Sequence, residues 1–325
     1  MGNRSPIAPS CWKNALLWAA GLAGLGTPLV VGILNAPAIR AQDATDWQTR
    51  AGGKMAFDVA SVKPSKGPFV PANFPLDPSD YYGATNGRLS ANDTLAAYIE
   101  FAYKVWGNEV QSREFTRFAK WVSTDLYTIE ARAPTGNPTK DQMRLMVQAL
   151  LADRFQMIAH FENREVPVYE LRLANPGKLG PKLISHADAP PCDKPGVSPV
   201  EEHPSFHFVC HTFSPYLDLG TTVVLGSRDV SMDVLAGTIS EALAGPVAFG
   251  RPIVDKTGLT GTFDFTLEWA RERRTLPGSD SPVASDPIGP TPLEALRDQL
   301  GLRLESAKAS IPILVIDRVE RPSAN

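Results

Sequence analysis

The chain repeats one pattern of helix and strand signals, and this repeat constrains its fold more than any other feature. Asp93–Ala96 and Asp233–Ala236 each begin a predicted helix. Apolar residues follow at the same i, i+4, i+7, i+8 spacing, which is typical of a helix with one buried face. An alternating strand pattern comes next in both halves, at Tyr127–Ala131 and at Phe265–Trp269. The repeat indicates an internal duplication.

Both halves continue with a second helix and two strands. Thr139 with Gln142, and Thr291 with Glu294, have the spacing of a capping box, which marks a helix start. The predicted strand pairs are Phe155–His160 with Val166–Leu173, and Leu302–Ser306 with Ile311–Val319. The residues expected to be buried are Leu95, Ile99, Met146 and Leu150 in the first copy and Leu235, Ile239, Leu296 and Leu300 in the second. We predict an α+β fold of two tandem copies of a strand-helix-strand-helix-strand-strand unit, with mixed or antiparallel sheets.

Segments rich in proline, glycine or polar residues divide the chain. An alternating strand at Phe57–Pro64 is expected to begin the first copy. The predicted organisation is a signal peptide or N-terminal membrane anchor at 1–42, a linker at 43–56, the first α+β repeat at 57–175, a proline-rich join at 176–205, and the second repeat at 206–320 with a loop insertion at 271–290.

The first 42 residues have the layout of a secretory signal peptide. Arg4 and Lys13 precede an uncharged apolar run from Ala15 to Leu34, and small residues suited to cleavage follow. About 20 apolar residues can also span a bilayer, so an uncleaved anchor is the alternative. We expect an exported protein, periplasmic or extracellular, or one anchored to the inner membrane by residues 15–34.

Two cysteines, Cys192 and Cys210, remain after the predicted cleavage. A pair of cysteines in an oxidising compartment predicts a disulfide. The bond would close a loop of about 19 residues and stabilise the fold by roughly 3 kcal/mol. Two buried thiols are the alternative.

Histidines gather beside the second cysteine. His203, His207 and His211 have a spacing that a helix would align toward a metal ion. The apolar residues between them instead predict a strand over 206–213, on which His207 and His211 lie about 13 Å apart. No metal site is therefore predicted, although His186 could still join one of these histidines.

Two catalytic motifs are matched in part between residues 255 and 261. Lys256-Thr257-Gly258 matches the third motif of penicillin-recognising serine enzymes, but the mature chain lacks their Ser-x-x-Lys. Asp255 to Gly258 resembles the aspartyl-phosphate motif of cation pumps, but a leucine follows it. We interpret the stretch as a structural turn built by Asp255, Lys256, Thr257, Gly258 and Gly261. No catalytic residue and no cofactor is predicted.

Segments spread over about 260 residues resemble the uncharacterised "soil-associated" family of exported proteins, typical of acidobacteria and built on a domain of unknown function. The matching segments are Phe57–Pro64, Ala149–Phe155, Val166–Tyr169, Val254–Gly261 and Leu314–Asp317. The resemblance implies no known activity. Related domains look to be fused to membrane-bound regulatory metallopeptidases of the antibiotic-sensor type, which by analogy implies sensing or binding outside the cytoplasm.

The function hypothesis is a non-catalytic ligand- or partner-binding module of the cell envelope. One alternative is an extracytoplasmic serine hydrolase that uses Lys256 with Ser61 or Ser231, and another is a structural cell-surface protein. The expected partner is an unknown envelope protein or a small ligand. The net charge of -3 gives no global reason for nucleic-acid binding. Membrane contact is expected only through an uncleaved N-terminal segment.

Tryptophans could also contribute to binding. Trp106, Trp121 and Trp269 could line a ligand cleft, although packing in the core is the commoner role of such residues.

Overall fold

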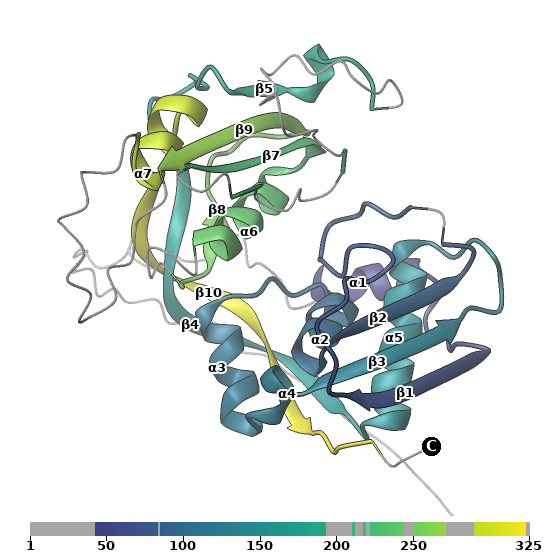
Figure 1. Ribbon diagram of the computed structural model, residues 1–325. Coiled ribbons are helices and arrows are strands. Elements are labelled where there is room, and N and C mark those ends of the chain that lie inside the picture. Colours follow the sequence, from purple (N-terminus) through teal and green to yellow (C-terminus); the bar gives the residue numbers. More distant parts are fainter. Residues whose placement is uncertain are drawn as a thin grey trace, which may run out of the picture. The chain divides into compact units, whose positions relative to one another are not determined.

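The computed structural model has an α+β fold with antiparallel and mixed sheets (Figure 1). It describes residues 43–83, 85–192, 210–211, 217–218, 222–243, 250–270 and 289–322. The predicted signal segment, most of the predicted strand 206–213 and most of the loop insertion lie outside these described residues.

The first half forms a three-stranded antiparallel sheet with helices on one side. Its elements are α1 (Asp43–Arg50), β1 (Val59–Ser65), β2 (Arg88–Thr94), α2 (Leu95–Tyr103), α3 (Glu109–Phe118), α4 (Trp121–Thr124), β3 (Leu126–Arg132) and α5 (Lys140–Arg154). The strand order is β1-β3-β2, so β3 is central. The Thr94 hydroxyl caps α2, and Thr139 with Gln142 forms the predicted capping box of α5. These caps satisfy backbone N–H groups that have no partner inside the helix.

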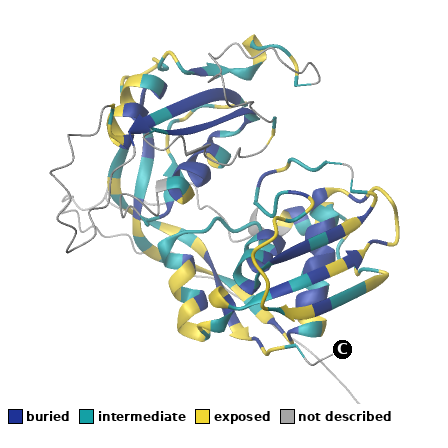
Figure 2. Cartoon of the chain, viewed as in Figure 1, coloured by how far each residue is buried: buried dark blue, intermediate teal, exposed yellow. Residues whose placement is uncertain are grey.

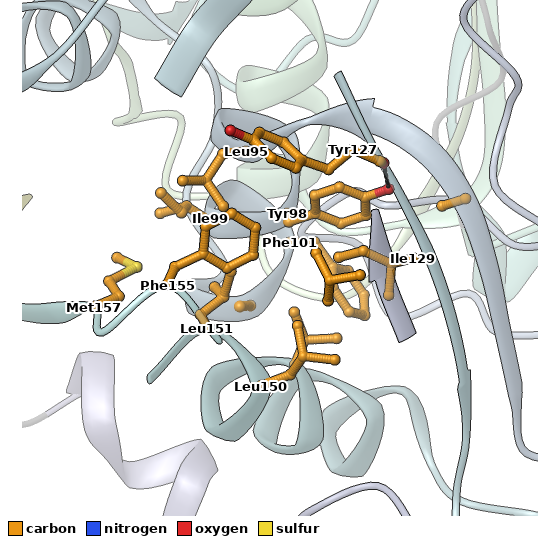
Figure 3. Packing of buried hydrophobic residues seen from close by; sticks show 14 of the residues in the cluster. Leu95, Tyr98, Ile99, Phe101, Tyr127, Ile129, Leu150, Leu151, Phe155 and Met157 are labelled. Carbon is orange, nitrogen blue, oxygen red and sulfur yellow. Dashed lines mark hydrogen bonds between the residues drawn. The ribbon is translucent and has the colours of Figure 1, made fainter. Parts of the chain in front are cut away.

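A dense apolar core lies between this sheet and the helices α2 and α5 (Figure 3). Tyr98 from α2 lies next to Ile129 from β3, and its hydroxyl donates a 2.8 Å hydrogen bond to the Tyr127 carbonyl. Phe155 packs edge-on against the Tyr127 ring. All eight residues that were predicted to be buried, in both halves, are at most 5% exposed. The helical periodicity therefore identified the core faces correctly.

The second half repeats this arrangement with a four-stranded antiparallel sheet. Its elements are β5 (Leu183–Ser185), η1 (His186–Asp188), β6 (Leu217–Asp218), β7 (Thr222–Val230), α6 (Met232–Leu243), β8 (Ile253–Asp255), β9 (Phe263–Ala270), α7 (Pro292–Ala295) and η2 (Leu296–Leu300). The strand order is β5-β9-β7-β6. The segment 176–205, predicted as a join, thus supplies the edge strand β5. Figure 2 shows that buried residues concentrate on the central strands of both sheets and on the helices beside them.

Two long strands replace the strand pairs that the sequence predicted. β4 (Ile158–Leu173) and β10 (Leu302–Arg318) are each continuous, and they pair with one another antiparallel along their length (Figure 1). The predicted breaks before Pro167 and Pro312 are wrong. Within the described part of the chain, β4 pairs on its other side only at Tyr169–Leu171, in parallel with β8. Proline is tolerated in a strand where its missing N–H faces an unpaired edge.

The pairing of β4 with β10 is symmetric in a way that duplication predicts. The matching motifs begin at Val166 and Ile311, and the residues just before them, Glu165 and Ser310, lie directly opposite each other. In the same register Val166, the residue after Glu165, faces Ala309, the residue before Ser310. Equivalent residues that face each other at the centre are what a two-fold axis between two copies requires.

The two strands that were predicted to be equivalent also occupy matching sheet positions. Tyr127–Ala131 lies in β3, between β1 and β2, and Phe265–Trp269 lies in β9, between β5 and β7. In each half, the strand beside them runs directly into a helix, α2 or α6. This is the topology of two copies of one unit.

The predicted linker at 43–56 begins with a helix. Trp47 in α1 is only 6% exposed, and Gln48 donates a 3.2 Å hydrogen bond to Gln148 on α5. Because the indole ring is removed from water, this part of the predicted linker is packed onto the first half. None of the helices in the described ranges is long and apolar enough to cross a membrane.

Candidate functional site

The predicted turn after β8 is held by its own side chains. The Asp255 carboxylate accepts hydrogen bonds from the Thr257 N–H at 2.9 Å and from the Thr257 hydroxyl at 2.8 Å. Gly258 and Gly261 have φ values of 72° and 88°, in the left-handed region. Glycine adopts this region without steric cost, and a short aspartate-threonine pair fixes the chain before it.

Lys256 in this turn has no serine partner in the described part of the chain. Its side chain is exposed, and its backbone N–H bonds to the Leu171 carbonyl at 2.9 Å. The Ser231 hydroxyl accepts from the Val234 N–H at the start of α6, and Ser61 lies on β1 in the first half. Within the described residues, no hydrogen bond therefore joins Lys256 to Ser61 or Ser231, the pairs that the hydrolase alternative names.

A disulfide joins Cys192 to Cys210, as the sequence predicted, with 5.9 Å between the Cα atoms. It holds residues 210 and 211 beside β7, where the His211 N–H donates to the Arg228 carbonyl at 2.8 Å. The bond therefore brings a distant segment against the central sheet of the second half.

A buried carboxylate organises the polar groups around this disulfide. Asp264 on β9 is fully buried, and its oxygens lie 2.6 Å from His186 Nδ1 and 3.1 Å from Arg228 Nε. The Asp229 N–H donates to the same carboxylate at 2.9 Å. An ionised carboxylate can only accept, so His186 Nδ1 carries the proton and Nε2 points away from Asp264. The positive charge of Arg228 offsets the cost of burying Asp264.

Asp229 is the point on which two imidazole rings converge. His186 Nε2 lies 3.8 Å from its Oδ2 atom, and His211 Nδ1 lies 3.1 Å from the same atom. The register of β7 with β9 shifts between Ser227 and Val230, so Asp229 sits on a bulge. Its φ of 53° is in the left-handed region. Bulges re-aim side chains, and strained positive φ values gather at functional sites.

We call the group formed by His186, His211, Arg228, Asp229 and Asp264 the Asp229 cluster. Within it, His186 and Asp229 offer donor atoms that lie within 4.8 Å of each other and of the Cys192 sulfur, which is bonded in the disulfide. These are the described residues best placed to hold a metal ion.

The sequence identified only part of this cluster. His186 and His211 both approach Asp229, while His203 and His207 lie outside the described residues. A metal site that His186 shares with one of the other histidines stays a prediction. Asp229 and Asp264 were missed. The signal was a charged residue inside an apolar strand, most clearly Asp264 between two phenylalanines. Such a charge is rarely buried without a specific partner.

A second polar group in the first half has a structural role. Arg144 on α5 is fully buried, and its guanidinium donates to the carbonyls of Asp77 and Ser79 at 3.1 and 2.6 Å. Lys140 Nζ lies 2.7 Å from the Asp77 carboxylate, and burial, partly opposed by Asp77, lowers the pKa of Lys140 to about 8. Both cations fasten the long loop before β2 to α5.

The tryptophans mostly pack against other residues. Trp269 is 2% exposed in β9, and Arg321 lies over the Trp121 ring at 5.3 Å. A β-carbon at Gly237 would lie 2.3 Å from the Trp106 ring, so glycine is required for this contact. These packed positions favour the core interpretation over a ligand cleft.

A surface hollow of about 460 Å³ lies at the end of α5. Its lining residues are Asp153, Arg154, Gln156, Glu320 and Arg321. Two acids and two bases leave it without net charge, and Asp153 and Arg154 already pair at 2.9 Å. Exposed pairs of this kind contribute little energy, so the hollow is a weaker candidate than the Asp229 cluster.

Comparison with known proteins matches residues 96–319 to the family described as "Protein of unknown function (DUF3738)". The match covers more than half of the chain, and the protein belongs to this family. The same comparisons found no match among curated proteins and none among solved structures. Membership in this family implies no activity and does not identify the source organism. The soil and acidobacterial part of the resemblance therefore remains a prediction.

Proposed function

We propose that this protein is an exported, non-catalytic binding module of the cell envelope, and that the Asp229 cluster receives its ligand. The observation that carries the proposal is the convergence of two imidazole rings on one oxygen of Asp229, at 3.1 and 3.8 Å. Buried Asp264 holds His186 in place by a hydrogen bond. A site held in position before binding loses less conformational freedom when the ligand arrives.

The charges of the cluster indicate the kind of ligand. Arg228 is directed at Asp264, whereas Asp229 is approached by histidine rings. Asp229 thus offers a carboxylate without an arginine or lysine partner among the described residues. A cation or a strong hydrogen-bond donor is the chemistry that complements it.

Export rests on the N-terminal sequence and agrees with the disulfide, which persists in oxidising compartments. Mass spectrometry of the mature protein is expected to find an N-terminus between about residues 39 and 43. Membrane retention of the whole chain would support the anchor instead. A cytoplasmic protein that keeps Met1 would contradict export.

The binding proposal is tested by calorimetry on the mature protein, oxidised and reduced, with divalent metal ions, polyamines and basic peptides. Asp229→Asn keeps the size of the side chain and removes its charge. Asp188→Asn, at an exposed position two residues after His186, is the matched control. We expect at least one of these cations to bind wild type and Asp188→Asn equally, and Asp229→Asn at least tenfold more weakly, about 1.4 kcal/mol.

Two results would contradict the proposal. One is the absence of any cation that distinguishes Asp229→Asn from wild type. The other is labelling by penicillin-type or ester probes that disappears in folded Lys256→Ala, which would establish the serine hydrolase alternative.

A further inference from the structure

We propose that the Asp229 cluster is a site for a divalent metal ion of the zinc type, which the Cys192–Cys210 disulfide closes and reduction of that disulfide opens. The inference rests on the proposed function and names its ligand class. It follows from three donor atoms of different chemistry that the fold brings together: a ring nitrogen of His186, an Asp229 carboxylate oxygen and Cys192 Sγ, all within 4.8 Å of one another.

The spacing of these atoms suits an ion between them. His186 Nε2 and Asp229 Oδ2 are 3.8 Å apart, which is too long for a hydrogen bond. Ligands of a tetrahedral zinc ion, with bonds of about 2.0 to 2.3 Å, stand roughly 3.3 to 3.8 Å apart. The gap between imidazole and carboxylate therefore has the size that one bound ion would fill.

The hydrogen-bond partner of His186 is of the kind that metal-binding histidines have. Such a histidine commonly donates its other ring N–H to a carboxylate, which fixes the ring and the tautomer. Asp264 does this at 2.6 Å from His186 Nδ1, and it is fully buried and held by Arg228. A purely structural hydrogen bond would explain the contact with Asp264. It would not explain why the opposite nitrogen faces a second carboxylate.

The state of Cys192 decides whether the third donor is available. Its sulfur is bonded to Cys210 in the structure, and a thiolate is the form of cysteine that binds metals. A dithiol reductant would transfer two electrons and two protons to the disulfide, giving two protein thiols and an oxidised, disulfide form of the reductant. Metal binding would then displace the proton of Cys192. A mixed set of sulfur, nitrogen and oxygen donors is typical of zinc.

Two single variants separate the metal ligand from the disulfide. Cys192→Ser and Cys210→Ser both abolish the bond, but only Cys210→Ser keeps the Cys192 thiol. Zinc affinity of the mature protein is measured by competition with a chromogenic chelator. Wild type is measured oxidised, and again after reduction by a water-soluble phosphine, which becomes the phosphine oxide as it and water convert the disulfide to two thiols.

We expect reduced wild type and Cys210→Ser to bind one zinc ion. Oxidised wild type and Cys192→Ser should bind it at least about 100-fold more weakly. Loss of a hydrogen-bond partner of a metal ligand already lowers the metal affinity about 10- to 100-fold, and here a ligand itself is lost. Asp264→Asn in the Cys210→Ser background should lose about 10- to 100-fold. Equal affinity of Cys192→Ser and Cys210→Ser would overturn the proposal.

A second measurement applies if the serine variants do not fold. Reduced wild type loaded with Co²⁺ should show a thiolate-to-cobalt charge-transfer band. The absence of this band from folded, reduced protein would overturn the proposal, as would unfolding of the wild type on reduction. If zinc fails but another cation still distinguishes Asp229→Asn, the metal inference falls and the binding function stands. If no cation does so, both fall.

Discussion

Glu100, on α2, is predicted to make the stability of the fold depend on pH. Burial, followed by the negative charges of Glu241 and Asp93, raises the pKa of Glu100 from 4.5 to about 8. The folded state therefore holds the proton more tightly than the unfolded state. This contribution to stability is fully present below 4.5 and is lost as the pH rises through about 8.

The magnitude follows from the two pKa values. Each pKa unit corresponds to about 1.36 kcal/mol, so wild type should lose about 4 kcal/mol from this group between about pH 5 and about pH 9. Glu100→Gln cannot ionise and should lose none of it. The exposed Glu165→Gln is the control and should follow wild type. Glu241→Gln removes the second-largest cause, so the loss should level off at a lower pH and be smaller.

Urea unfolding monitored by circular dichroism measures these free energies across the pH range. The expected result is a curve for Glu100→Gln that diverges from wild type as the pH rises, with the variant more stable in alkaline solution. Parallel curves for wild type and Glu100→Gln would refute the reasoning. They would mean that water reaches the carboxyl in the fold and that its pKa is close to that in the unfolded chain.

Four further variants test other parts of the structure. Replacing both Cys192 and Cys210 by alanine should cost about 3 kcal/mol, measured by thermal unfolding, because the bond closes a short loop in the unfolded chain; an unchanged stability would count against this. Gly258→Val should cost about 1 to 3 kcal/mol because its φ is 72°, whereas Lys256→Ala should stay within about 0.5 kcal/mol; a larger loss for the lysine change would show that its side chain is needed for the turn. Arg144→Met should cost about 3 to 5 kcal/mol in urea unfolding, because it removes a buried charge that pairs with Asp141 and donates to the carbonyls of Asp77 and Ser79; a neutral effect would mean that water replaces the guanidinium.

The local elements could be predicted from the sequence because their signals are local. The capping boxes at Thr139 and Thr291 and the left-handed Gly301 after η2 depend on residues within a few positions of each other. The buried stripes follow from a period that the chain itself carries. The disulfide could be predicted because only two cysteines remain after the predicted export signal. The α+β class and the equivalence of β3 and β9 could also be predicted, because the helix and strand patterns that indicate them are local.

The pairing of β4 with β10 could not be predicted from local signals. Each strand looks interrupted at its proline, and only the partner more than 130 residues away shows that the strand continues. The Asp229 cluster has the same origin. His186 follows β5, Asp229 sits on a bulge of β7 and Asp264 lies on β9, and nothing in their spacing brings them together. Most helices and strands follow from local signals in the sequence, because backbone bonding and periodic burial act over a few residues. Which charges meet depends on the assembled sheet, because burying Asp264 requires partners from distant strands.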